Sequence, residues 1–235
     1  MAIQSGETTF YQAKRGIVQS GLILNLDAGV DESYNGGTTW TDLEGSNNGT
    51  LTNGPAFDSD NGGSIIFDGT NDYVALSSTM IDPNQDWTIF FFINRSATQT
   101  STIVCGTGQS LQVRFDGTGY WVDHMQVLNS TVAGVARFTN FGPRGSVQRS
   151  LGVWYNAAIT KSSYTYSLYI DGEFNQSVTD GDEVTFTNGP NEIGSRTAHT
   201  EFFNGKLSNF SFYNRTLTAA EILQNFNAMK HRFGI

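Results

Sequence analysis

The sequence predicts an all-β fold in which two antiparallel sheets stack as a sandwich, with one short helix near the C-terminus. Aromatic residues make up 13% of the 235 residues and charged residues only 15%, a balance typical of buried strands and unlike that of a disordered chain. Apolar residues alternate in many short runs, and abundant Gly, Asn, Thr and Ser between the runs are typical of turns. A chain of this length can bury a core that needs no disulfide, and its single cysteine, Cys105, is expected to be a small buried thiol.

The strands are expected in short runs along most of the chain. Residues 64–76 predict two strands around a polar turn, and the apolar run at residues 87–93 suits the centre of a sandwich. Asp171-Gly172 predicts a hairpin, because a type I′ turn needs positive φ at both central residues. Further strands are expected at residues 21–27, 102–105, 111–115, 125–128, 153–159, 166–170, 174–178 and 205–213.

One helix is predicted after residue 218. Thr218-Ala-Ala-Glu221 is a capping box, in which the Thr218 hydroxyl accepts the backbone N–H three residues on and Glu221 reaches back. An apolar stripe at helical spacing follows and predicts a face that packs on the sandwich rather than a ligand groove: Ile222, Leu223, Phe226 and Met229.

The expected organisation is an N-terminal arm over residues 1–20 and a single domain over residues 21–235, because no repeat or linker divides the rest of the chain. The N-terminal residues lack the apolar stretch of a secretion signal, and the longest apolar run, Ile89–Ile93, is too short to span a membrane. Synthesis in a cytoplasm without membrane insertion is therefore expected. The net charge of −9 argues against nucleic acid as a partner, since phosphate backbones bind to dense Lys/Arg surfaces.

Three ordered motifs resemble the concanavalin A-like (laminin-G-like) jelly-roll domains. Residues 151–178 resemble that family's Gly-x-Trp strand and Tyr-x-Asp-Gly hairpin. Residues 205–226 are similar to its closing strand, Tyr-Asn-Arg turn and Thr/Ser-x-x-Glu-Ile helix, and FDGTNDYV at residues 67–74 matches a third element. The likeness covers about residues 21–230 and implies a two-sheet jelly roll.

Three segments resemble the sequences of concanavalin A-like proteins from tailed bacteriophages, especially those that infect marine cyanobacteria. These segments are GLILNLDAG, TTWTDLEGSNNGTLTNGPAF and NFNAMKHRFG, at residues 21–29, 38–57 and 225–234. The resemblance implies a non-enzymatic structural protein of the virion, made in the host cytoplasm, that decorates the capsid or serves a tail or fibre. Its expected partners are other virion proteins and copies of itself. The alternative is a lectin-like module that binds host-surface polysaccharide.

No cofactor is expected, and calcium is the one candidate ligand among metals. Many relatives carry an acidic pair in the closing strand, where this chain has Ser208 and Asn209. Asp68 and Asp72, with Asp27 and Asp42 as further candidates, could supply carboxylate ligands, and a calcium site usually needs two or more. Asp in such turns also commonly bonds its own backbone, so both interpretations stand.

No catalytic motif is found, and the chain is expected not to be an enzyme. The Glu-x-Asp-x-x-Glu strand of the glucanase relatives is absent, because no glutamate here has an Asp two positions later. No Gly-x-Ser-x-Gly elbow occurs, and the three histidines lack zinc-pair spacing. A polysaccharide-degrading enzyme remains a minor alternative.

Two groups of residues are candidates for binding. Tyr120, Trp121 and His124 combine rings that can stack on sugars with polar groups that can bind hydroxyls, although Trp121 could instead fill the core. The second group consists of basic residues, which suit protein interfaces and are candidates for contacts with other virion proteins: Lys14, Arg15, Arg137, Arg144 and Arg149. Most of them could instead belong to an irregular loop that is exposed to solvent.

Overall fold

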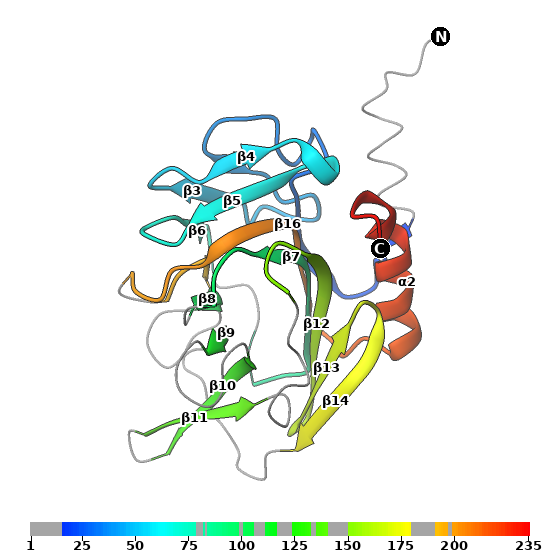
Figure 1. The fold of residues 1–235 in the computed structure, drawn as a ribbon. Coiled ribbons are helices and arrows are strands. Elements are labelled where there is room, and N and C mark those ends of the chain that lie inside the picture. The colour runs from blue at the N-terminus through cyan, green and yellow to red at the C-terminus, as the bar shows by residue number, and fades with distance from the viewer. Residues whose placement is uncertain are drawn as a thin grey trace.

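The protein is a two-layer β-sandwich with one helix packed outside it, as the sequence predicts (Figure 1). The computed structural model describes residues 16–78, 82, 84–98, 101–105, 111–116, 124–132, 135–140, 150–179, 191–196 and 199–235, with strands 101–105, 124–132 and 135–140 described by their backbone. The expected buried thiol of Cys105 therefore lies outside the side chains described. Every strand pair described in the two sheets is antiparallel.

The first sheet is built around two long neighbouring strands that run through the middle of the molecule. Its order is β14 (Glu173–Thr179), β13 (Thr165–Ile170), β12 (Trp154–Ser162), β7 (Trp87–Arg95), β16 (Asn204–Tyr213), β5 (Ser64–Asp68) and β4 (Ala56–Asp58). β1 (Leu22–Asp27) pairs with the later part of β16, next to β5 on the same edge. All nine residues of β7 are buried, which fits the prediction of a central strand.

The second sheet faces the first and supplies the other half of the core. Its order is β11 (Val135–Asn140), β10 (His124–Val132), β9 (Gln112–Asp116), β8 (Ser101–Cys105), β15 (Glu192–Ile193), β6 (Tyr73–Leu76), β3 (Gly49–Thr52) and β2 (Thr39–Trp40). The strands β2, β3, β4, β11 and β15 were not among the predicted ones. Most are two to four residues long, which leaves too few alternations for a period of two to be recognised.

Large apolar side chains fill the space between the sheets. Ile89, Phe91 and Ile93 of β7 meet residues from the opposite sheet such as Val113 and Phe115, all almost fully buried. The alternate residues of β7 face the other way, because successive strand residues point to opposite faces. A core of this kind stabilises the fold without any covalent link.

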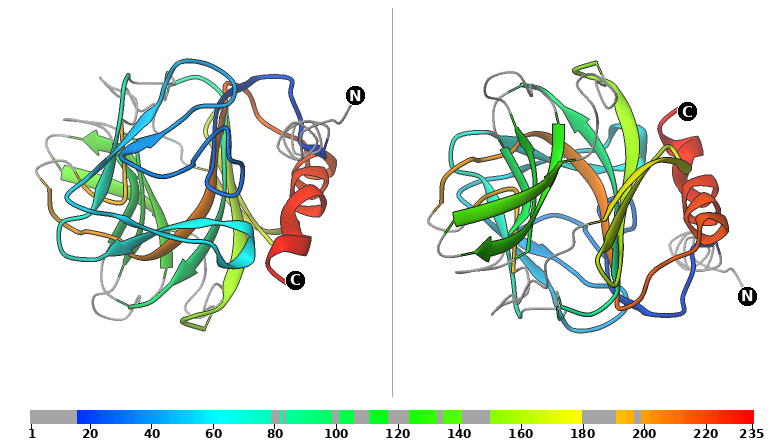
Figure 2. Two further views of the ribbon diagram at one scale, coloured as in Figure 1. Left: turned by 90° about the horizontal axis from the view of Figure 1, so that it is seen from above. Right: turned by 90° about the horizontal axis from the view of Figure 1, so that it is seen from below.

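The helix α2 (Ala219–Met229) covers the outer face of the first sheet, opposite to the second sheet (Figure 2). Its predicted capping box is present: Glu221 N donates to Thr218 Oγ1, and Thr218 N donates to the Glu221 carboxylate. Ile222 and Phe226 are buried against the sheet as expected. The prediction for Leu223 is wrong, because this side chain is 37% exposed and the helix buries Asn225 in its place.

Buried polar groups explain why Asn225 faces the sheet. Its Oδ1 accepts the backbone N–H of Val18, its Nδ2 donates to the Tyr213 hydroxyl, and that hydroxyl donates to the Val18 carbonyl. Burial raises the pKa of Tyr213, so its hydroxyl keeps its proton and can donate. This network fixes residues 16–20, the described part of the predicted arm, beside α2, where Ile17 and Val18 are buried. Residues 1–15 lie outside the described residues.

The short helix η3 (Lys230–Arg232) follows α2 directly, and a further turn of this type, η1 (Asp60–Gly62), precedes β5. Within the described segments, no helix is long and apolar enough to span a bilayer.

Candidate functional site

The residues predicted to make contacts fall largely outside the part of the chain that the structure describes. This holds for Tyr120 and Trp121 among the glycan candidates, and for the basic residues Lys14, Arg15, Arg144 and Arg149. His124 lies at the first position of β10, in register with Asp116 of β9. Arg137 lies in β11, in register with Ser130 of β10, so the backbone places it on the edge strand of the second sheet.

The two calcium candidates Asp68 and Asp72 hold their own turn together. Asp68 Oδ1 accepts the backbone N–H groups of Thr70 at 2.7 Å and Asn71 at 3.3 Å. Asp72 Oδ2 accepts the N–H of Asp68 at 2.9 Å, and burial raises the pKa of Asp72. Among the described residues, no group of three or more His, Cys, Asp or Glu side chains is placed to hold a metal ion. The described contacts of this pair are therefore those of a self-bonded turn.

The further acidic candidates are also engaged by the protein itself. Asp42 accepts the N–H groups of Asn25 and Glu44 with Oδ1 and that of Asn47 with Oδ2. Asp27 forms an ion pair with Arg232 at the C-terminus, 205 residues away in the chain. The side chains at Ser208 and Asn209, where relatives carry acids, are buried hydrogen-bonding groups within β16.

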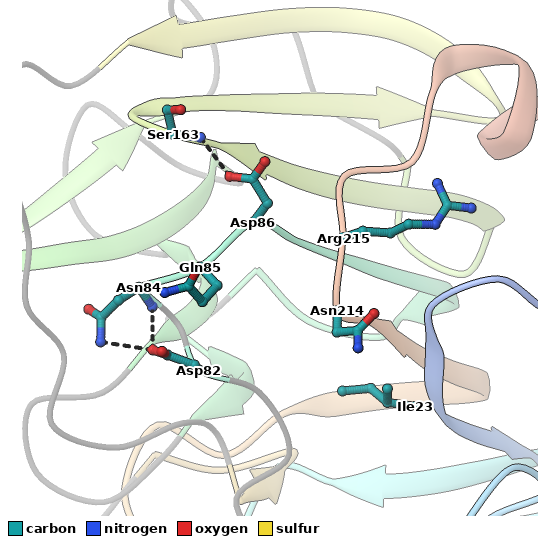
Figure 3. Close-up of a pocket in the computed structure, with 8 residues that line it drawn as sticks. All are labelled: Ile23, Asp82, Asn84, Gln85, Asp86, Ser163, Asn214 and Arg215. Atoms are coloured by element: carbon teal, nitrogen blue, oxygen red, sulfur yellow. Dashed lines mark hydrogen bonds between the residues drawn. The ribbon is translucent and has the colours of Figure 1, made fainter.

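A pocket opens at one end of the sandwich, where four separate segments meet (Figure 3). Its volume is about 720 Å³, which lies within the usual range for small-molecule sites. Of the lining residues that the structure describes, all but one are polar: Ile23, Asp82, Asn84, Gln85, Asp86, Ser163, Asn214 and Arg215. They come from β1, the loop before β7, the β12–β13 turn and the segment between β16 and α2.

A buried lysine holds the loop that forms one wall of the pocket. Lys161 of β12 is 7% exposed, and its ammonium group donates to the carbonyls of Asn84 at 2.9 Å and Gln85 at 3.0 Å. Burial lowers the pKa of Lys161, while the nearby Asp86 and Asp82 carboxylates act in the opposite direction. The ammonium group thus holds the loop through two backbone carbonyls.

The two carboxylates of the pocket are oriented by hydrogen bonds from neighbouring N–H groups. Asp86 Oδ1 accepts the N–H of Ser163 at 2.8 Å, which joins the loop to the β12–β13 turn. Asp82 Oδ1 accepts both the backbone N–H and the side-chain Nδ2 of Asn84, each at 2.9 Å. Both aspartates remain exposed, so a ligand can reach their remaining lone pairs.

Arg215 lines the pocket with its aliphatic stem, while its guanidinium group forms hydrogen bonds with residues outside the pocket. Its guanidinium donates to the Glu221 carboxylate at 2.6 Å and 3.0 Å and to the carbonyls of Ser20 and Thr216. The hydrogen bonds from Arg215 to Glu221 lower the pKa of Glu221 to about 2, well below its usual value. Figure 3 shows the guanidinium directed away from Asp82 and Asn84.

The pocket offers carboxylate, amide and hydroxyl groups at one place, a set that suits a ligand rich in hydroxyls. No sequence pattern predicted this pocket, because its four segments are far apart in the chain. The one signal in the sequence is the polar run just before the apolar strand at residues 87–93, which includes Asp82, Asn84, Gln85 and Asp86.

The sheet order and the outer helix define a sandwich of the concanavalin A-like type. Residues 68–223, more than half of the chain, match the family described as the concanavalin A-like lectin/glucanases superfamily, and the chain belongs to this superfamily. A comparison with curated protein sequences finds no significant match.

Solved structures share the fold at low sequence identity. The receptor-binding domain of the botulinum neurotoxin C/D mosaic serotype aligns over 88% of this chain and 51% of its own length, with a TM-score of 0.68 and 14% identity. This chain therefore spans about half of that domain. Domain 4 of AbnA, a GH43 extracellular arabinanase from Geobacillus stearothermophilus, was solved in complex with arabinotriose. It aligns over 88% of this chain and 99% of its own length, with a TM-score of 0.68 and 14% identity.

A third similar structure is the sialidase of Trypanosoma rangeli, solved with the inhibitor DANA. It aligns over 89% of this chain and 33% of its own length, with a TM-score of 0.62 and 17% identity. At such identities the likeness establishes the fold alone.

Proposed function

We propose that this chain is a non-enzymatic glycan-binding module and that the pocket beside the β12–β13 turn holds the sugar. The observation that carries the proposal is the polar lining of a cavity of about 720 Å³ by side chains from four segments. Sugar hydroxyls both donate and accept hydrogen bonds, so they pair with a mixture of carboxylates and amides. The arabinotriose-bound arabinanase domain, which this chain resembles over nearly all of that domain, supports a sugar as the ligand.

The absence of catalysis is part of this proposal. A glycosidase needs one carboxyl group that carries a proton and a second that attacks or activates water. In this proposal Asp82 and Asp86, which each accept an N–H group of a nearby residue, serve as hydrogen-bond acceptors for sugar hydroxyls. Release of reducing sugar from any glycan that the protein binds would contradict this part of the proposal.

The test is a glycan array with the purified protein, followed by titration of the bound glycans against variants. Gln85→Ala combined with Asn214→Ala removes two exposed polar side chains from the pocket and should weaken binding by roughly tenfold or more, since each hydrogen bond contributes about 1 kcal/mol. Asn35→Ala, in the exposed loop that follows the opposite end of β1, is the matched control. Equal affinities for both variants would exclude the pocket as the site.

A second candidate function is structural, in the virion of a tailed bacteriophage, and the two functions are compatible. It is supported by the phage-like segments of the sequence, such as residues 21–29 and 225–234, and by the way Ile17 and Val18 attach the N-terminal segment to the sandwich. In this function the protein would lie in the virion as a capsid decoration or tail accessory subunit, and form a symmetric oligomer.

Deletion of residues 1–15 tests the structural function, because it keeps the buried contacts of Val18 and so leaves the domain folded. The truncated protein should no longer attach to particles that lack the native copy, while its circular dichroism and unfolding midpoint stay unchanged. Undiminished attachment would contradict a role of the N-terminal segment. Arg137→Glu would then test the second basic candidate region separately.

A further inference from the structure

The guanidinium group of Arg232 lies inside a set of oxygen atoms near the end of the chain. Its Nη1 donates to the two carboxylate oxygens of Asp27, at 2.8 Å and 2.9 Å. Its Nη2 donates to Ser208 Oγ at 2.8 Å and to the carbonyls of Gly62 at 3.0 Å and Gly63 at 3.4 Å. The set, here called the oxygen cage, thus has one carboxylate, two carbonyls and one hydroxyl from β1, β16 and the turn around η1.

The backbone around the oxygen cage is packed too closely for any side chain. A Cβ atom on Gly29 would lie 1.9 Å from the Gly62 carbonyl oxygen and 2.0 Å from Arg232 Nη2. A Cβ atom on Gly63, whose φ is +106°, would lie 2.4 Å from the carbonyl oxygen of Ala28. Glycines therefore let two backbone stretches, residues 28–29 and 62–63, approach each other and the Arg232 side chain. Figure 1 shows the turn before β5 close to the C-terminal segment.

The fit between the guanidinium and the oxygen cage is incomplete. Arg232 Nε is buried and has no hydrogen-bond partner among the described residues, although all five N–H groups of a guanidinium are donors. The oxygens, in contrast, are well engaged: Asp27 Oδ1 also accepts the Gly29 N–H, and Ser208 Oγ also donates to the Gly63 carbonyl. A spherical cation would satisfy the same oxygens and leave no buried donor without an acceptor.

The donor set is the one that a hard divalent cation prefers. Calcium takes six to eight oxygen ligands from carboxylates, carbonyls and water at about 2.3–2.6 Å in a flexible geometry. The oxygen cage supplies five oxygens, and water can supply the others. Magnesium is a poorer fit, because it requires near-octahedral ligands at about 2.0–2.1 Å and keeps most of its waters.

We propose that Arg232 is a built-in cation that occupies a calcium-type site, so that removal of its guanidinium group converts the oxygen cage into a binding site for Ca²⁺. The wild-type fold is then independent of calcium, because the chain supplies the positive charge itself. The inference is independent of the glycan pocket, which lies at the end of β1 that carries Ile23, whereas the oxygen cage lies at the Asp27 end. With a single carboxylate, the site should be weak, with a Kd of roughly 10⁻³ M.

Thermal unfolding of wild-type protein and Arg232→Ala tests the proposal in EDTA, in about 10 mM CaCl₂ and in about 10 mM MgCl₂, concentrations well above a Kd of that order. The wild-type midpoint should be the same in all three conditions. The variant should unfold several degrees lower in EDTA, and calcium but not magnesium should raise its midpoint. Adding Asp27→Asn to the variant should abolish the calcium effect.

Arg196→Ala is the matched control, since it removes an arginine that pairs with Glu201 at 2.8 Å and whose partner is not part of the oxygen cage. Its midpoint should not respond to calcium. If Arg232→Ala is unfolded in EDTA, its refolding yield on addition of calcium gives the same information, and a chain that stays unfolded in calcium overturns the proposal. A midpoint of Arg232→Ala that calcium leaves unchanged, or a wild-type midpoint that EDTA lowers, also overturns it.

Discussion

The ion pair between Glu221 and Arg215 joins the helix cap to the pocket, and Glu221→Gln isolates the contribution of its charge. Glutamine can still accept the Thr218 N–H through its side-chain oxygen, so the capping box is retained. The substitution removes only the negative charge that two guanidinium nitrogens contact at 2.6 Å and 3.0 Å. It should therefore lower the free energy of unfolding and also release the Arg215 side chain that lines the pocket.

The expected magnitude follows from the pKa of Glu221 and from its exposure. A change from 4.5 to about 2 corresponds to roughly 3 kcal/mol between the protonated and ionised forms. The Glu221 and Arg215 side chains are 27% and 30% exposed, and solvent screening reduces such pairs toward about 1 kcal/mol. We expect Glu221→Gln to lower the free energy of unfolding by about 1–2 kcal/mol at pH 7.

Urea denaturation followed by tryptophan fluorescence measures this loss, and its pH dependence tests the cause. The pKa of Glu221 is lower in the folded state, so its stabilisation is complete above about pH 4.5 and is lost as the pH falls toward 2. The difference between wild type and Glu221→Gln should fall to less than half by about pH 3. A difference that stays constant from pH 7 to pH 3 would refute the electrostatic explanation. Glu32→Gln, an exposed acid in the loop after β1, is the control.

Three further substitutions test other parts of the structure. Lys161→Met should weaken glycan binding and lower the free energy of unfolding by about 1–3 kcal/mol, because it removes the donor that holds the pocket loop. An unchanged rate of amide hydrogen exchange in that loop would contradict this role of Lys161. Gly172→Ala should lower the free energy of unfolding, measured by urea denaturation, more than Gly152→Ala does. Both glycines have positive φ, but of the two only Gly172 would place a Cβ atom 2.9 Å from another atom, an aromatic carbon of α2. Asp27→Asn should lower the free energy of unfolding by about 3–5 kcal/mol, because it leaves the Arg232 charge without its carboxylate. A loss below about 1 kcal/mol would show that the pair is not effectively buried.

Local signals in the sequence predicted much of the fold. Asp171 and Gly172 adopt φ of 51° and 79°, as the hairpin prediction requires, and the capping box at Thr218 forms with both of its hydrogen bonds. These features depend on residues close together in the chain, whose conformational preferences act in any tertiary context. The error at Leu223 arose because the buried hydrogen bonds of Asn225, to Val18 at 207 positions and to Tyr213 at 12 positions, were not visible in the spacing.

The candidate site was not predictable in the same way. Asp82 and Asn214 line one pocket although 132 positions separate them, and Lys161 contacts Asn84 in the pocket loop from β12, 77 positions away. The glycan and virion contacts proposed for Tyr120, Trp121 and Lys14 lie outside the described residues and stay predictions.

The sequence by itself determined the fold class, most of the strands and the helix, since alternation, turn residues and capping are properties of neighbouring residues. Only the tertiary structure decided which polar residues meet. It brought Asp27 to Arg232 and the pocket loop to Asn214, because strand order and crossover connections set those distances, and no local pattern encodes them.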